Sequence, residues 1–136
     1  NLSIEIEDYL YVLADKLHLN NILHNLFDNA IKYCKVVPEI TVVARQKNNF
    51  VYLEVKDKGL GIPMEYQPKV FDKFFRVPTG NIHNVKGFGL GLYYVKSICK
   101  SHHWKIEMES KEGEGTCIRI KMPAGKAPDS SGNKTN

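Results

Sequence analysis

Residues 17–33 carry two stripes of opposite character at helical spacing. Asp15, just ahead, is a favourable N-cap residue, and Pro38, shortly after, prevents much continuation. The pattern predicts a helix that packs one side on a core. The apolar positions on that side are Leu19, Ile22, Leu23, Leu26, Phe27, Ala30 and Cys34.

The opposite side of this helix is unusually rich in asparagine. Asn21, Asn25, Asn29 and Lys32 line up at spacings of four, four and three. Asparagine is a poor helix former, costing roughly half a kcal/mol or more relative to alanine. The stripe is either a solvated face that happens to be rich in asparagine or a functional surface. The helix alone leaves both interpretations open.

The rest of the chain alternates between strand patterns and short helical ones. A second helix of about a dozen residues is predicted after the glycine-rich residues 87–92, and the interspersed elements indicate an α+β fold. We expect a two-layer α/β sandwich, with a mixed, mostly antiparallel sheet covered on one face by about three helices. The predicted strands are residues 2–7 (half-buried on one side), 39–46, 50–56, 105–109 and 116–122, with 9–14 as a further short strand.

Length and composition fit one domain, which we place at residues 1–123. With 43% hydrophobic residues the chain can form a proper core. Residues 124–136 contain no aliphatic side chain larger than alanine, so we expect a disordered tail or an expression remnant. Because the chain begins without methionine and leads directly into a strand pattern, we interpret it as a fragment of a longer protein.

Several functional classes are disfavoured by composition. No apolar run is long enough to span a membrane. Cys34, Cys99 and Cys117 lie far apart in apolar segments, which is typical of reduced core cysteines and not of a metal site. A net charge of +4 suits an anionic ligand but is too small and too scattered to predict nucleic-acid binding.

Two glycine-containing segments are candidate ligand-binding loops. The sequence GFGLGL at residues 87–92 feeds a helix N-terminus, where free N–H groups and the helix dipole favour an anion. It lacks the spacing of a Walker A loop or of a dinucleotide fingerprint, so it is equally compatible with a structural turn. The sequence DKGLGIP begins with Asp57, whose carboxylate could accept a hydrogen bond from an exocyclic amine. Taken alone, a local turn explains that aspartate as well.

The order of these motifs carries more information than any one of them. The asparagine stripe ending in NAIKY, the D-x-G-x-G segment, the phenylalanine-rich FDKFFR and the G-x-G-x-G turn occur in sequence between residues 2 and 123. This arrangement resembles the nucleotide-binding domain of sensor histidine kinases. That family belongs to the GHKL group with gyrase, the MutL repair proteins and the large heat-shock chaperone, which share the Bergerat ATP-binding fold.

The resemblance implies roles for the polar stripe of the first helix. Asn29 would ligate a Mg²⁺ ion that bridges the triphosphate, assisted by Asn25 on the same face, and oxygen ligands suit this hard ion. Lys32 would neutralise phosphate charge, and Tyr33 would pack near the adenine or ribose.

The resemblance also implies an adenine end and a lid. Asp57 would accept the adenine amino group and Thr116 would lie under the ring, while residues 77–86, which we expect to be a mobile loop, would form an ATP lid. The other residues of the implied nucleotide-binding set are Gly59, Gly61, Ile62, Phe75, Arg76, Lys86, Gly87, Gly89, Leu90, Gly91 and Leu92.

One position separates the subgroups of the superfamily. Its ATPases carry a glutamate general base one turn before the metal-binding asparagine, whereas this chain has Asn25 there. We therefore expect phosphoryl donation assisted by positioning and electrostatics, with slow hydrolysis by water.

The expected function is that of the ATP- and Mg²⁺-dependent catalytic domain of a two-component sensor histidine kinase. It would transfer the γ-phosphoryl group to a histidine on an upstream dimerisation domain, from which a response regulator receiver domain would take it. The parent protein would be a membrane-anchored homodimer, with this domain in the cytoplasm. Two alternatives are an anti-sigma-type serine kinase of the same fold and a nucleotide-sensing module without catalysis.

Overall fold

The computed structural model describes residues 1–77 and 91–126. Its centre is a five-stranded sheet with the order β1-β2-β3-β5-β4. Strand β1 pairs with β2 in parallel, and all the other pairs are antiparallel. The strands are β1 (Leu2–Ile6), β2 (Ile40–Lys47), β3 (Phe50–Asp57), β4 (Lys105–Lys111) and β5 (Gly115–Pro123).

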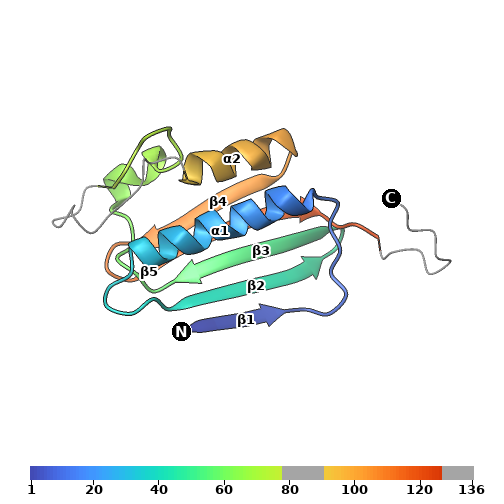
Figure 1. Cartoon of the computed structure of the whole chain (residues 1–136), viewed down its shortest axis with the longest axis horizontal. Helices are drawn as coiled ribbons and strands as arrows, with labels where there is room; N and C mark the ends of the chain where they lie inside the picture. The colour runs from blue at the N-terminus through green and yellow to red at the C-terminus, as the bar shows by residue number, and fades with distance from the viewer. Residues whose placement is uncertain (78–90, 127–136) are drawn as a thin grey trace.

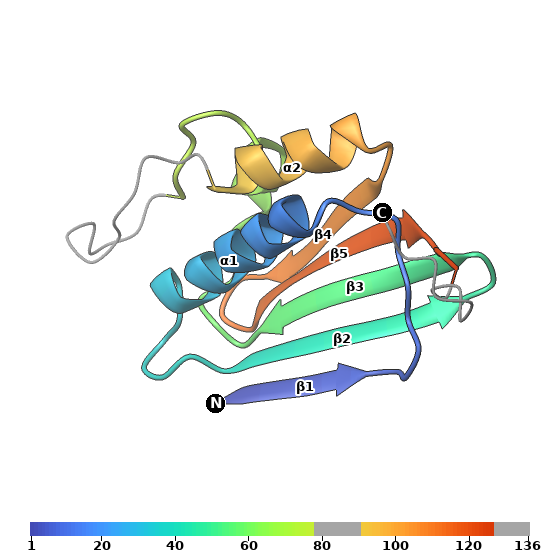
Figure 2. The same cartoon turned by 45° about the vertical axis from the view of Figure 1, so that its right-hand side comes forward.

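Helices α1 (Lys16–Lys32) and α2 (Gly91–Ser101) lie side by side on one face of this sheet (Figure 1). Together with the 3₁₀ helix η1 (Met64–Lys69), they form the second layer of the expected α+β sandwich. The turned view shows that α1 and α2 lie on the same side of the strands (Figure 2). The fold class predicted from the sequence is confirmed. No helix among residues 1–77 and 91–126 is long and apolar enough to cross a bilayer.

Helix α1 begins as its sequence predicts. The carboxylate of Asp15 accepts a hydrogen bond from the Leu17 N–H at 2.8 Å and so caps the first turn. The centre of the apolar stripe is buried in the core and its remaining residues are partly buried, and full burial of one large apolar side chain contributes about 1.5–3 kcal/mol. The core that α1, α2 and the sheet share includes Ile22, Leu26, Ala30, Val42, Leu53, Val55, Val95, Ile98, Cys99, Ile118 and Ile120.

The prediction for the first strand was wrong in one respect. Strand β1 forms, but all of its residues are exposed, although one side was expected to be buried. Leu2, Ile4 and Ile6 pair in register with three buried residues of β2 yet remain 53–61% exposed. The physical reason is that α1 and α2 lie over the middle and far side of the sheet and leave β1 uncovered (Figure 2).

Two further differences concern the segment that follows β1 and the segment that follows β5. Residues 9–14 do not form the additional strand that their apolar pattern suggested; only Val12 forms an isolated bridge, with Ala124. The Gly125 N–H also donates to the Tyr11 carbonyl. These contacts extend the ordered fold past Pro123, where the sequence placed the domain boundary, and residues 127–136 lie outside the described residues.

Candidate functional site

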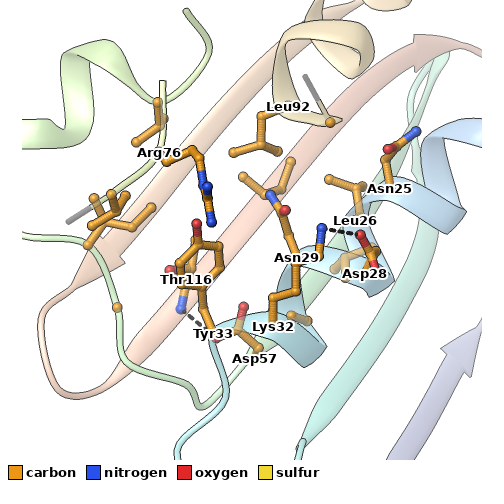
Figure 3. A pocket seen from close by; sticks show the side chains of 18 of the residues that line it. Asn25, Leu26, Asp28, Asn29, Lys32, Tyr33, Asp57, Arg76, Leu92 and Thr116 are labelled. Carbon is orange, nitrogen blue, oxygen red and sulfur yellow. Dashed lines mark hydrogen bonds and ion pairs between the residues drawn. The ribbon is translucent and has the colours of Figure 1, made fainter. Parts of the chain in front are cut away.

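One pocket opens between the C-terminal half of α1, the adjacent ends of β3 and β5, and the start of α2 (Figure 3). Five of its apolar lining residues are buried, whereas its polar lining side chains are partly or fully exposed, a combination that is usual for a small-molecule site. The apolar part comprises Leu26, Ala30, Val55, Ile62, Val70, Phe75, Val77, Leu92 and Ile118; the remaining lining residues are Asn25, Asp28, Asn29, Lys32, Tyr33, Asp57, Gly61, Arg76, Gly91 and Thr116.

The asparagine stripe of α1 is not a solvated face. Asn21 donates a hydrogen bond to the Tyr94 hydroxyl of α2 at 3.2 Å, and Asn25 donates to the Asn21 carbonyl at 2.8 Å. Asn29, one turn later, points into the pocket (Figure 3), and its side chain has no hydrogen-bond partner among the described residues. The stripe therefore joins α1 to α2 at one end and presents an available amide to the pocket at the other.

Asp57 ends β3 at the closed side of the pocket. Its Oδ1 accepts hydrogen bonds from the backbone N–H of Gly59 at 2.8 Å and of Thr116 at 3.3 Å. Burial raises the pKa of this carboxyl above its usual value, and the two hydrogen bonds only partly oppose that increase. Within the described residues, Oδ2 has no partner, so it is available to accept a hydrogen bond from a ligand.

Close backbone contacts hold the loop after Asp57 in place. A Cβ atom on Gly59 would lie 2.4 Å from the Tyr33 carbonyl oxygen, and a Cβ atom on Gly61, where φ is +70°, would lie still closer to the Lys111 carbonyl oxygen. Glycine is required at both positions because a side chain would collide with backbone that cannot yield. Gly59 does not line the pocket; it acts on the site through its hydrogen bond to Asp57 and its close approach to the Tyr33 backbone.

Tyr33 and Arg76 approach each other across the pocket from opposite walls (Figure 3). Burial raises the pKa of the Tyr33 hydroxyl, while the nearby Arg76 guanidinium and the hydrogen bond from it partly oppose this effect. The contact brings a cationic side chain from the segment after η1 to the same rim that carries Lys32.

Sequence reasoning missed a serine that fixes the wall below Asp57. Ser110 Oγ accepts a hydrogen bond from the Ile62 N–H at 2.8 Å and shares another with the Thr116 hydroxyl, also at 2.8 Å. Ser110 belongs to β4, and its strand partner Thr116 pairs on its other side with Asp57. The β4–β5 register could have suggested it, since a polar strand residue opposite Thr116 must lie at this end of the sheet.

The structure brings most of the predicted site residues together. The pocket is lined by Asn25, Asn29, Lys32, Tyr33, Asp57, Gly61, Ile62, Phe75, Arg76, Gly91, Leu92 and Thr116. The predicted residues Lys86, Gly87, Gly89 and Leu90, with most of the predicted lid, lie outside the described residues. Asp28 lines the pocket but was not predicted, although its spacing of four from Lys32 was visible in the sequence.

The donor set suits a magnesium ion that arrives with its nucleotide. Within residues 1–77 and 91–126, no group of three or more histidine, cysteine or acidic side chains could hold a metal alone. Mg²⁺ is usually bound through one or two protein oxygens, several waters and substrate phosphates, so a preformed cage is not required. The side-chain amide of Asn29, which points into the pocket, has one hard oxygen of this kind.

Comparison with known proteins places the chain in a family. Residues 14–126 match the family described as Histidine kinase-, DNA gyrase B-, and HSP90-like ATPase. This match covers most of the chain, and the chain belongs to that family.

Sensor proteins are among its relatives. It is 45% identical over 114 residues to the sensor protein RprX of Bacteroides fragilis (strain YCH46), a stretch that covers 82% of this chain and 22% of RprX. It is 35% identical over 116 residues to the sensor histidine kinase WalK of Bacillus subtilis (strain 168), covering 84% of this chain and 19% of WalK. The chain therefore spans about a fifth of the length of these two relatives.

Solved structures show the same fold. The nucleotide-free catalytic domain of histidine kinase ThkA superposes with a TM-score of 0.76 at 29% identity, covering 90% of this chain and 79% of that one. The mycobacterial sensor histidine kinase MprB gives a TM-score of 0.71 at 26% identity, covering 90% and 82%.

Proposed function

We propose that this domain binds ATP together with Mg²⁺ and is the catalytic domain of a two-component sensor histidine kinase. The main observation in support of the proposal is a single pocket whose two ends carry different polar groups. At the closed end Asp57 offers a carboxylate oxygen, and at the open end Asn29 and Lys32 line the rim. An adenine with a triphosphate attached matches both ends at once.

The inner part of the pocket supports adenine recognition. The available Oδ2 of Asp57 would accept a hydrogen bond from the exocyclic amino group, and Val55 and Ile118 provide apolar surface beside it. Guanine presents a carbonyl oxygen where adenine has this amine, so its approach to the carboxylate would be repulsive. The pocket is therefore expected to select adenine over guanine.

The outer part supports binding of the phosphates. Lys32 and Arg76 would neutralise phosphate charge, and the Asn29 amide oxygen would hold the metal. When bound, Mg²⁺ supplies electrostatic stabilisation of charge on the transferring phosphoryl group. The chain's contribution is to fix the nucleotide so that its γ-phosphoryl group faces the opening of the pocket.

Transfer requires an acceptor from outside this chain. An imidazole nitrogen of the acceptor would form the new N–P bond as the bond from the γ-phosphorus to the bridging oxygen breaks, leaving ADP. Asn25, at the position where ATPases of the superfamily carry their glutamate base, cannot take a proton from water near neutral pH. We therefore expect transfer to histidine and very little hydrolysis.

The names of the relatives suggest where the domain acts. The acceptor histidine would lie on an upstream dimerisation domain, and the phosphoryl group would pass to an aspartate of a response regulator receiver domain. We propose a membrane-anchored homodimer as the parent protein, with this domain on the cytoplasmic side. An anti-sigma-type serine kinase is the main alternative, and acid stability of the phosphorylated product distinguishes them, because phosphoserine survives acid and phosphohistidine does not.

Isothermal titration with a non-hydrolysable ATP analogue, with and without Mg²⁺, tests binding. The wild-type domain should bind the analogue, and Asn29→Ala should lose the gain in affinity that Mg²⁺ provides while remaining folded. A longer chain that includes the upstream helices then tests transfer. Failure of the wild type to bind the analogue, or a phosphorylated product stable to acid, would contradict the proposal.

A further inference from the structure

Asp28 places a negative charge at the open end of the pocket. Its Oδ2 lies 2.8 Å from the Lys32 ammonium nitrogen, one helical turn along α1 (Figure 3). Both side chains line the pocket, with Lys32 26% and Asp28 47% exposed. A partly exposed ion pair at this spacing generally adds only about 0.3–0.5 kcal/mol to the stability of a helix. The position of this ion pair in the pocket lining suggests that it affects ligand binding instead.

The charges of the described lining balance one another. The cations Lys32 and Arg76 face the anions Asp28 and Asp57, so the described part of the pocket has no net charge. A fully ionised triphosphate is strongly anionic, and a site that binds it commonly offers an excess of positive charge. Here Asp28 offsets the cation closest to it and also repels the phosphates.

We infer that Asp28 makes this site select the magnesium complex of a nucleotide over the free nucleotide. The inference rests on the proposed function, since it concerns how the same pocket binds ATP. The repulsion from one carboxylate scales with the net charge of the ligand, and a bound divalent cation lowers that charge. The carboxylate therefore opposes binding of free ATP more than binding of its magnesium complex.

The Asp28→Asn substitution tests this directly because it removes the charge and keeps the size of the side chain. The probe is a non-hydrolysable ATP analogue titrated calorimetrically, once with excess Mg²⁺ and once with a chelator. We expect the free analogue to bind roughly fivefold more tightly and the magnesium complex roughly twofold more tightly. The affinity gained from Mg²⁺ would then fall by about 2.5-fold.

Two matched variants separate this effect from others. Asp28→Glu keeps the charge and should keep the wild-type dependence on Mg²⁺. Asp8→Asn changes the net charge of the protein by the same amount at a site away from the pocket. Asp8 follows β1 at the end where Ile6 pairs with Ala44 of β2, whereas the pocket residue Asp57 pairs with Ile40 at the opposite end of β2. Asp8→Asn should leave both affinities unchanged.

The outcomes are distinguishable from a failure of the proposed function. If wild type binds the analogue and Asp28→Asn changes both affinities by the same factor, or weakens both, the inference is wrong and the pair only positions Lys32. If wild type does not bind the analogue at all, the proposed function itself fails. A circular dichroism melting curve for each variant excludes unfolding as the cause.

Discussion

The backbone of Gly59 lies directly against the carbonyl group of Tyr33, which fastens the loop after β3 to the C-terminal end of α1. The Leu60 N–H donates to the same carbonyl at 2.9 Å. This contact joins the two elements that carry the polar groups at either end of the pocket. It adds to the packing of α1 on the sheet, which also positions Asp57 relative to Asn29.

Gly59→Ala should therefore impair both the fold and the site. The new Cβ would lie 2.4 Å from the Tyr33 oxygen and 2.9 Å from Asp57 Oδ1, so the backbone must shift. We expect a loss of about 2–4 kcal/mol in the free energy of unfolding and weakened ATP binding. Urea denaturation followed by the fluorescence of Trp104, the single tryptophan, measures the first effect.

Gly113 provides the control for this substitution. Unlike Gly59, it has a positive φ, at +84°, and a Cβ there would have no described atom within 4 Å. Gly113→Ala should cost only about 1 kcal/mol of backbone strain and leave nucleotide affinity unchanged. A loss of stability at Gly59 no larger than the loss at Gly113 would show that the collision with the Tyr33 carbonyl group is not what requires glycine at position 59.

Asp57→Asn should separate stability from binding. Because burial raises the pKa of this carboxyl in the folded state, its ionisation opposes folding at neutral pH. The asparagine variant should then be slightly more stable than wild type at pH 7. That advantage should disappear as the pH falls through the folded pKa, where the wild-type carboxyl becomes neutral too. Thermal melts from pH 3 to pH 8 measure it.

The same variant should lose nucleotide affinity despite its greater stability. An amide can still accept the Gly59 and Thr116 hydrogen bonds, but it offers an N–H where the adenine amine needs an acceptor. ATP and ADP should both bind roughly 10- to 100-fold more weakly. A loss confined to ATP would mean that Asp57 contacts phosphate and not the base.

The open face of the sheet contains an ion pair whose contribution depends on pH. Glu54 is 2% exposed and accepts a hydrogen bond from Arg119. Burial alone would raise the pKa of Glu54, but the Arg119 guanidinium outweighs it and the pKa is lowered. A lowered pKa means that this carboxylate contributes stability above its unfolded pKa, and the contribution is lost as the pH falls through the folded value.

Arg119→Met should thus destabilise the protein by about 2–3 kcal/mol at pH 7, because it leaves a buried carboxylate without its main partner. The difference from wild type should shrink in acid, where Glu54 becomes protonated. Lys105→Met, which removes the exposed pair with Glu107 at 3.9 Å, should change the free energy of unfolding by less than about 0.5 kcal/mol. Denaturation at pH 7 and pH 3 provides the comparison.

The absence of a glutamate at position 25 leads to a kinetic prediction. The isolated domain should hydrolyse ATP far more slowly than about one turnover per second, because position 25 carries an amide that cannot act as a base for water and the Asp28 carboxylate is paired with Lys32. A phosphate-release assay measures this rate. Turnover of several per second would show that another group, or another position of Asn25, supports water attack.

Much of the site could be read from the sequence because its polar residues are periodic or sit at element ends. Asn25, Asn29 and Lys32 share one helix face by their spacing, and Asp57 follows a clear strand pattern. Their meeting in one pocket could not be derived from periodicity, since it depends on how α1 crosses the sheet. The family resemblance supplied that step.

Other features escaped because they depend on contacts between distant segments. The exposure of Ile4 follows from where α1 lies, not from its own alternating pattern. The bridge between Val12 and Ala124 pairs two segments without a strand signature. Ser110 Oγ bonds Gly115 and Thr116 within the β4–β5 pair, but its hydrogen bond from the Ile62 N–H depends on the packing of β4 beside the loop after β3. In each case the local sequence does not indicate which distant segment the residue contacts.

The uncovered strand β1 has a practical consequence for work with the isolated domain. It is the terminal strand of the sheet, and its three apolar side chains are more than half exposed. Such an edge is a template for pairing between molecules. Concentrated samples should therefore lose solubility by association through β1 before they lose their native structure, and calorimetric titrations are best performed on dilute protein.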